Sequence, residues 1–304
     1  MISREDAQQR AQLWNDTYAY LDRFFAERGY TNVRTPIAVA SPGMEPNLDP
    51  VGIDLNVIRR GKVRAGLITS PEYSMKKLLG AGMERIYTVT PVFRNVEELG
   101  GDHSIEFTML EWYRQGADYH ACMDETEALI DGFVGGRGER WPRFSYVDLL
   151  AAWQGARGAT DEDTFNQHIL PSLMVTYDRF FVNEFPIDQA ALAQKSPDGR
   201  SAQRFEAYVG GMELCNGFTE LVDANEQRAR FRMEQEERRA AGKEVFPIDE
   251  ELLSRLSSVA SPTFGNALGV DRLVMLKAAA KDIDSIHLFP PSERFTQQGY
   301  GISE

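Results

Sequence analysis

The sequence predicts a mixed α+β fold in which helices flank an antiparallel sheet. Residues 86–93 and 107–114 are β-rich and are separated by a polar loop, so they are expected to form a long antiparallel hairpin. Residues 205–209 and 212–214 lie on either side of a Gly-Gly pair, which is typical of a two-residue hairpin turn. Helical segments alternate with these hairpins, and this alternation favours an α+β domain.

Helices are expected before, between and after the hairpins. Residues 4–28 carry apolar side chains at helical spacing, with Ser3 as the N-cap and Gly29 at the end. Ser70 and Pro71 supply the cap and the first residue of a second helix that runs to about Leu79. The remaining expected elements are a short strand at 31–35 and helices at 121–134, at 224–241 (highly charged and expected to face solvent), and after a glycine-rich turn within 265–280.

The composition is that of a globular domain, with 42% hydrophobic residues. No apolar run approaches the roughly 20 residues of a membrane span, and the polar N-terminus does not resemble a signal peptide. Two cysteines far apart, Cys122 and Cys215, fit a reducing cytoplasm. A net charge of -13 weighs against broad nucleic-acid binding. We expect one large domain at 1–288 and a C-terminal tail at 289–304.

The first hairpin combines side chains that are unusual for a core. Strand alternation places four residues on one face: Phe107, Met109, Glu111 and Tyr113. Arg94 ends the partner strand, and its planar guanidinium group is suited to binding a phosphate. The loop that follows contains Glu97, Glu98 and His103. These residues favour a ligand site, although a surface hairpin with ordinary charges would also accommodate them.

The second hairpin brings two carboxylates together. The Gly-Gly turn pairs Val209 with Met212. It then pairs Tyr208 with Glu213 and places Glu206 diagonally across from Glu213 on the same face. Two neighbouring carboxylates repel each other unless a cation lies between them, and their oxygen atoms suit Mg²⁺. The alternative interpretation is a solvated strand face with ordinary surface carboxylates.

Three residues downstream have the opposite parity to Glu213: Asn216, Phe218 and Glu220. A bulge in the strand would turn them to the same face, and Gly217 is the expected place for it.

Four further residues are weaker indications of a ligand site. Gly265 and Gly269 allow a close approach of the backbone to a ligand. Arg272 is a cation without an evident partner among apolar neighbours. Glu72 begins its helix, where an acid also complements the helix dipole, so its position alone does not indicate a ligand.

In order and spacing, these segments resemble the three signature motifs of class II aminoacyl-tRNA synthetases. The matching segments are Thr35-Pro36, Phe93-Arg94-Asn95 with Glu106-Phe107-Thr108, and Gly269-Val270-Asp271-Arg272. Details resemble the lysyl branch, in Thr69-Ser70-Pro71-Glu72, Glu111-Trp112-Tyr113 and Asn216-Gly217-Phe218-Thr219-Glu220-Leu221. Within that branch the chain is most similar to the elongation factor P lysine ligases, which lack an anticodon-binding domain. This chain likewise opens on the first helix of the catalytic domain.

The resemblance implies a two-step reaction, in which an amino acid is activated by ATP as an acyl-adenylate and is then transferred to an amine. The implied catalytic residues are Arg94 and Arg272. The implied ATP-binding residues are Arg94, Glu97, Glu98, His103, Phe107 and Arg272. The implied Mg²⁺ ligands are Glu206 and Glu213. The implied amino-acid-binding residues are Ser70, Glu72, Glu111, Tyr113, Asn216, Phe218, Glu220, Ala267 and Gly269.

The implied amino acid is lysine or (R)-β-lysine, the implied acceptor is a lysine side chain of elongation factor P, and the implied assembly is a homodimer. Ala267 replaces a glycine typical of lysyl-tRNA synthetases, and its methyl group favours (R)-β-lysine. The loop at 95–105 departs from the family by one extra residue. Two alternatives stay open: a lysyl-type synthetase that charges tRNA or another small acceptor, and a non-catalytic paralogue that binds an amino acid or a nucleotide.

Overall fold

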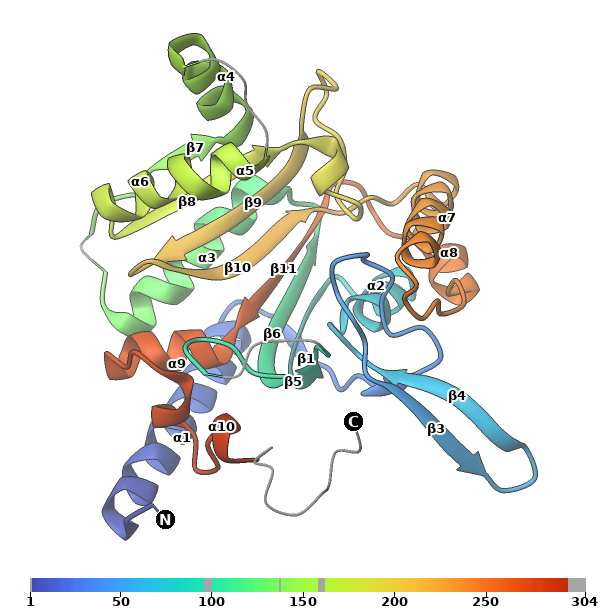
Figure 1. The fold of residues 1–304 in the computed structure, drawn as a ribbon, viewed down its shortest axis with the longest axis horizontal. Helices are drawn as coiled ribbons and strands as arrows, with labels where there is room; N and C mark the ends of the chain where they lie inside the picture. The colour runs from blue at the N-terminus through green and yellow to red at the C-terminus, as the bar shows by residue number, and fades with distance from the viewer. Residues whose placement is uncertain (1, 96–99, 137, 158–161, 295–304) are drawn as a thin grey trace.

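The computed structural model describes residues 2–95, 100–136, 138–157 and 162–294 (Figure 1). Glu97 and Glu98 therefore lie outside the described residues. The centre of the fold is an eight-stranded sheet with the order β1-β5-β6-β11-β10-β9-β8-β7. Its strands are β1 (Thr31–Asn32), β5 (Arg85–Phe93), β6 (Glu106–Gln115), β7 (Arg143–Ser145), β8 (Arg179–Phe185), β9 (Ala202–Val209), β10 (Met212–Thr219) and β11 (Thr263–Gly269). The inner pairs are antiparallel and the two edge pairs are parallel, so the α+β prediction is confirmed.

Helices cover both faces of this sheet (Figure 1). On one face lie α1 (Arg4–Ala26), α3 (Tyr119–Val134) and α9 (Val270–Ala278). Leu110 and Trp112 of β6 are fully buried in the core on that side, where the Trp112 ring packs against Phe25 of α1. The opposite face is flanked by α2 (Glu72–Gly80), α7 (Ala224–Ala240) and α8 (Glu250–Leu256). Because side chains alternate along β6, Glu111 and Tyr113 point to this second face.

The remaining elements are peripheral. A three-stranded sheet consists of β2 (Ala38–Val39), β3 (Gly52–Val57) and β4 (Gly61–Leu67). A helical layer beside β8 consists of α4 (Tyr146–Arg157), α5 (Glu162–Thr164), the π-helical turn η1 (Phe165–Ile169) and α6 (Leu170–Thr176). Short turns complete the chain at η2 (Ile187–Gln189), η3 (Ile283–Ile286) and α10 (Pro291–Arg294). None of the helices in the described part of the chain is long and apolar enough to cross a membrane.

The structure corrects four local predictions. The strand expected at 31–35 pairs only over Thr31 and Asn32. Helix α2 begins at Glu72, so Pro71 is the residue before the helix and not its first residue. Ser70 Oγ accepts only a long 3.4 Å hydrogen bond from the Glu72 backbone N–H. The glycine-rich turn expected at the start of 265–280 is strand β11, because its backbone pairs with β6 and β10 on both sides. Helix α7 does not simply face solvent, since the side chains of Glu234 and Arg238 are buried.

The hairpin of β9 and β10 contains the predicted bulge at a different place. The pairings Val209–Met212 and Tyr208–Glu213 are as predicted. The register then shifts between Glu213 and Cys215, so the bulged residue lies before Asn216 and not at Gly217. Gly217 is instead needed for packing, because a Cβ atom there would lie 2.7 Å from the Phe205 ring.

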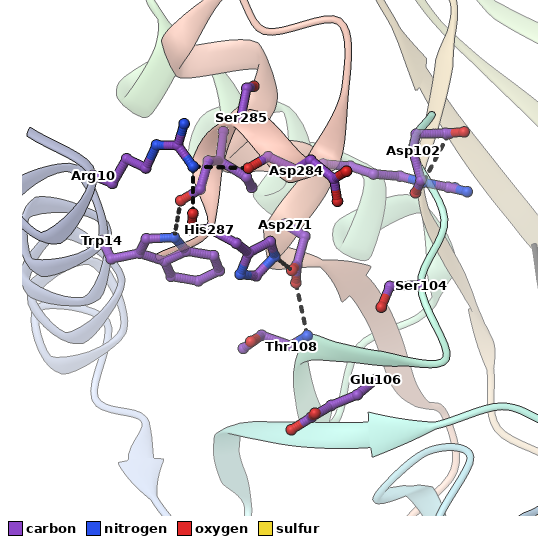
Figure 2. Close-up of polar contacts among 12 residues, drawn as sticks. Arg10, Trp14, Asp102, Ser104, Glu106, Thr108, Asp271, Asp284, Ser285 and His287 are labelled. Carbon is purple, nitrogen blue, oxygen red and sulfur yellow. Dashed lines mark hydrogen bonds and ion pairs between the residues drawn. The ribbon is translucent and has the colours of Figure 1, made fainter. Parts of the chain in front are cut away.

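The C-terminal segment fastens α9 to the first helix and to the sheet, as Figure 2 shows. Asp271, the first residue after Val270 in α9, accepts a 2.7 Å hydrogen bond from the Thr108 backbone N–H and lies 2.7 Å from His287 Nε2. Arg10 and Trp14 of α1 donate to the backbone carbonyls of Asp284 and Ile286 respectively. This network fixes the start of α9, and therefore the position of Arg272.

Candidate active site

A cavity of about 960 Å³ lies on the sheet face flanked by α2 and α7, and it is the candidate active site. Segments 45–48 and 186–193 form further parts of its wall. Eight of the residues selected from the sequence line it: Ser70, Glu72, Arg94, Glu111, Tyr113, Asn216, Phe218 and Ala267. They come from five separate parts of the chain, so the fold brings together residues that no single segment could have assigned.

Strand register explains how these residues meet. Glu111 of β6 pairs with Ala267 of β11, Ala267 pairs with Asn216 of β10, and Asn216 pairs with Glu206 of β9. Directly paired residues point to the same face and lie close together. One row across four strands therefore carries predicted amino-acid-binding residues at one end and a predicted metal ligand at the other.

A second row lies one step along the strands. Tyr113 pairs with Gly265, Gly265 with Phe218, and Phe218 with Arg204. Glycine is required at the centre of this row, because a Cβ atom at Gly265 would lie 2.1 Å from Glu220 Oε1 and 2.3 Å from the Tyr113 ring. The absence of a side chain lets the Glu220 carboxylate and the Tyr113 ring pack directly over the strand.

Lys76 of α2 holds two of the predicted amino-acid-binding carboxylates. Its Nζ atom lies 2.5 Å from Glu72 Oε1 and 2.6 Å from Glu220 Oε2, and all three side chains are buried. Burial raises the pKa of Glu220 to about 8 even though Lys76 opposes that shift. Burial also raises the pKa of Glu72, again against the effect of Lys76. Lys76 alone therefore does not compensate the burial of these two carboxylates, and a second cation would stabilise their ionised forms.

Glu111 is the third carboxylate of this group. It is 1% exposed and accepts a 2.8 Å hydrogen bond from the Tyr113 hydroxyl. Burial, with the charge of Glu72 second, raises the pKa of Glu111 well above its ordinary value. When Glu72, Glu111 and Glu220 are all ionised, Lys76 balances one of three negative charges. The pocket then lacks two positive charges, and buried carboxylates are costly unless such charges are supplied.

Arg94 stands at the other end of the cavity, directly after β5. Its backbone N–H donates a 2.9 Å hydrogen bond to the Ile105 carbonyl, which continues the hairpin past Phe93. Its guanidinium carbon lies 5.1 Å from the centre of the Phe107 ring, close enough for a cation–π contact. The Phe107 ring itself does not line the cavity, in contrast to Arg94.

The expectation that Arg272 has no evident partner is wrong. Its Nη1 donates a 2.7 Å hydrogen bond to the Glu213 carbonyl, and its Nε lies 3.1 Å from Asp102 Oδ2. Asp102 also lies 2.8 Å from His103 Nδ1, and Arg272 Nη2 lies 3.2 Å from His103 Nε2. Asp102 belongs to the loop that departs from the family pattern, and it contacts two of the predicted nucleotide-binding side chains, those of His103 and Arg272.

Glu206 and Glu213 share one face of the hairpin, as predicted, but Glu206 already has two partners. Arg204 Nη2 and the Tyr208 hydroxyl both donate to its carboxylate. Burial, with the charge of Glu206 second, raises the pKa of Glu213 to about 7, while Arg272 opposes the shift. A cation at Glu213 would relieve that repulsion, and the carboxylate oxygens of the pair are of the kind that would suit Mg²⁺.

Several predicted residues lie outside the cavity wall: His103, Phe107, Glu206, Glu213, Glu220, Gly269 and Arg272. Glu220 lies directly behind the wall, beneath Gly265. Four residues that were not selected from the sequence contribute to the site: Lys76, Asp102, Arg204 and Glu234. Lys76 had a signal, because it follows Glu72 by one helical turn and basic–acidic pairs at that spacing interact. Arg204 also had a signal, because it lies two residues before Glu206 and therefore on the same face of the strand. Its Nε donates a 3.0 Å hydrogen bond to Asn216 Oδ1.

The fold and this site define a class II synthetase-type catalytic domain. The family model "tRNA synthetases class II (D, K and N)" matches residues 1–293. The chain therefore belongs to this family, and it is an ATP-dependent ligase of the class II type.

More specific relatives are also found. The elongation factor P–(R)-β-lysine ligase of Erwinia tasmaniensis is 37% identical over 308 residues, which cover 89% of this chain and 91% of the relative. Ligases of the same name from Avibacterium paragallinarum and Klebsiella pneumoniae are each 36% identical, over 89% of this chain and 92% and 91% of the relatives. The branch of class II indicated by the sequence motifs is thereby confirmed.

Proposed function

We propose that this enzyme activates (R)-β-lysine or lysine with ATP and transfers it to a lysine side chain of elongation factor P. The charge of the amino-acid pocket supports this substrate class most directly. Glu72, Glu111 and Glu220 exceed Lys76 by two charges when ionised, and the proposed substrates carry two ammonium groups. An aspartate- or asparagine-like side chain would leave these carboxylates uncompensated. The names of the relatives support the acceptor.

In the first step, the carboxylate of the amino acid attacks the α-phosphorus of ATP, and pyrophosphate leaves. Arg94 at the cavity wall holds the α-phosphate and stabilises the charge that develops there. Arg272, which Asp102 holds in place, binds the phosphates of ATP. The Phe107 ring stacks on the adenine. When bound by Glu206 and Glu213, Mg²⁺ supplies charge neutralisation for the phosphates.

Ala267 supports a preference for (R)-β-lysine. Its side chain lines the cavity between Glu111 and Asn216 in the strand row. A methyl group there displaces the amino-acid backbone relative to a glycine, and moving the amino group by one carbon accommodates that displacement.

The acceptor is tested by mass spectrometry. Purified enzyme, ATP and (R)-β-lysine should add one lysyl mass to elongation factor P, at a lysine side chain. A lysine-to-arginine change at the modified position is the control and should abolish the added mass. Charging of tRNA without modification of elongation factor P would support the tRNA alternative instead.

Substrate binding should depend on pH, because Glu220 must be ionised to bind an ammonium group. Its pKa of about 8 in the free enzyme means that it is mostly protonated at neutral pH. The affinity for (R)-β-lysine should therefore rise roughly fivefold between about pH 7 and pH 8, with release of a proton on binding. Calorimetry in buffers of different ionisation enthalpy measures both quantities. An affinity that stays constant over this range would contradict the assignment of Glu220.

We also propose a homodimer in the cytoplasm, with a catalytic domain at 1–288 and a tail at 289–304. Hairpin β3–β4 supports the dimer, because Leu55, Val57, Ile58 and Val63 expose apolar side chains, with Ile58 90% exposed. The two free and buried cysteines are compatible with a reducing compartment. Within the proposed tail, Arg294 of α10 lies 2.7 Å from Glu106.

A further inference from the structure

Helix α7 and segment 45–48 contribute a second group of carboxylates to the cavity wall. Glu45, Glu234 and Glu237 all line the cavity. Glu234 is 6% exposed, and its Oε2 atom is buried without a hydrogen-bond partner. A buried carboxylate oxygen without a donor is costly, and because Glu234 lines the cavity, a donor that arrives with the ligand would satisfy it.

This outer group lacks the cation that the inner group has. Among the described residues, no Lys, Arg or His side chain forms an ion pair with any of these three carboxylates. Arg230 lowers the pKa of Glu234 electrostatically, but its guanidinium group is paired with Glu226 and donates to the carbonyls of segment 190–193. Burial, followed by the charges of Glu45 and Glu237, raises the pKa of Glu234 to about 8.

The outer group is also fixed in place. Arg238, one turn after Glu234 on α7, is 1% exposed and donates 3.0 Å and 2.6 Å hydrogen bonds to the carbonyls of Glu45 and Leu48. The segment that carries Glu45 is thereby tied to the helix that carries Glu234. Glu72 of the inner group lines the same cavity as the three outer carboxylates, so the two groups share one continuous space.

We propose that Glu234, with Glu45 and Glu237, binds the ammonium group of the acceptor lysine and takes a proton from it. This inference rests on the proposed function. Both ammonium groups of the amino acid are compensated by the inner carboxylates, which leaves the outer group for the acceptor. A lysine ammonium group has an ordinary pKa of about 10.4, so it must lose a proton before it can attack.

The chemistry balances without another reactant. The Glu234 carboxylate accepts one proton from the ammonium group and leaves a neutral amine. The amine nitrogen attacks the acyl carbon of the adenylate, the C–N bond forms, and the C–O bond to phosphate breaks with its electron pair on AMP. The second nitrogen proton passes to solvent, and the product is an amide.

The test separates the two half-reactions with Glu234→Gln, which keeps the size of the side chain and removes its charge. Amino-acid-dependent ATP–pyrophosphate exchange should stay within about twofold of wild type, while single-turnover transfer from preformed adenylate should fall by about a hundredfold. Hydroxylamine is neutral near pH 7, so hydroxamate formation should remain at the wild-type rate. Glu236→Gln, an exposed position on the same helix, is the matched control and should change neither reaction.

Transfer is measured to elongation factor P and to Nα-acetyl-lysine methylamide. Wild-type transfer to elongation factor P tests the proposed function, whereas the ratio of variant to wild type with either acceptor tests Glu234. Unchanged transfer in Glu234→Gln would overturn the inference. Equal losses of exchange and transfer, or a loss of hydroxamate formation, would overturn it as well.

Discussion

Replacing Arg94 with alanine is expected to lower amino-acid-dependent ATP–pyrophosphate exchange by roughly a thousandfold, since one preorganised donor to a developing charge contributes about 10²–10³ in rate. Arg94 lines the cavity directly after β5, and its backbone is anchored to Ile105. The guanidinium group is held over the Phe107 ring, so it is oriented before the substrate binds. Such preorganisation explains why the loss should fall on the rate and not mainly on substrate affinity.

Two further variants make the Arg94 result specific. Arg94→Lys keeps the charge but loses the planar pair of donors, so it should recover only part of the exchange rate. Arg85→Ala removes an exposed guanidinium group from the same strand, where it donates to the Arg28 carbonyl, and should leave exchange unchanged. Thermal unfolding of each variant checks its fold. Exchange above a tenth of the wild-type rate in a folded Arg94→Ala enzyme would remove Arg94 from the first step.

Local rules predicted much of the framework correctly. The Gly-Gly turn fixed the pairing of Tyr208 with Glu213, because a two-residue loop leaves no freedom of register. Strand alternation placed Glu111 and Tyr113 on one face, and the structure brings both to the cavity. A bulge was predicted because Asn216 has the opposite parity to Glu213, but parity does not determine where the bulge lies. The register shift lies between Glu213 and Cys215, in the pairing of β10 with β9, and the residues of one strand alone do not determine it.

The rest of the site depends on contacts between distant segments. Asp102 lies in an unfamiliar loop, and its role follows from the position of α9, which the C-terminal segment fixes through His287 and Asp271. Glu234 belongs to a helix whose charges suggested exposure. Its burial results from the docking of α7 against segment 45–48 through Arg238, some 190 residues away in sequence. No local periodicity contains that information.

Replacing Lys76 with methionine is expected to lower the free energy of unfolding by about 3–5 kcal/mol, because removal of one partner leaves a buried charge uncompensated. Two carboxyl groups lose their partner here, those of Glu72 and Glu220, each within 2.6 Å of Lys76 Nζ in the native enzyme. Lys77→Met is the matched control. Its side chain is 25% exposed beside Asp249 and Glu251, so its loss should cost about 1 kcal/mol or less.

The double variant Lys76→Met with Glu220→Gln separates the loss of charge compensation from the loss of packing. If the uncompensated carboxylate causes the instability, then the double variant should be more stable than Lys76→Met alone, with a coupling energy of at least about 1 kcal/mol. Urea denaturation monitored by circular dichroism measures the free energy of unfolding of wild type, the two single variants and the double variant. Additive losses in the two single variants would show that Lys76 contributes through packing and not through its charge.

The pH dependence of Lys76→Met has a definite sign. Glu220 already has a folded-state pKa of about 8, above its ordinary value of 4.5, and removal of Lys76 raises that pKa further. The folded state then binds more protons than the unfolded state between these values, so stability falls as pH rises through the window. The deficit of Lys76→Met relative to wild type should therefore grow as pH rises from about 7 to about 9, because in that range Glu220 ionises in the folded wild type and stays protonated in the folded variant. A deficit that shrinks toward alkaline pH would mean that Lys76 does not compensate Glu72 and Glu220, and the argument for a diammonium substrate would lose its basis.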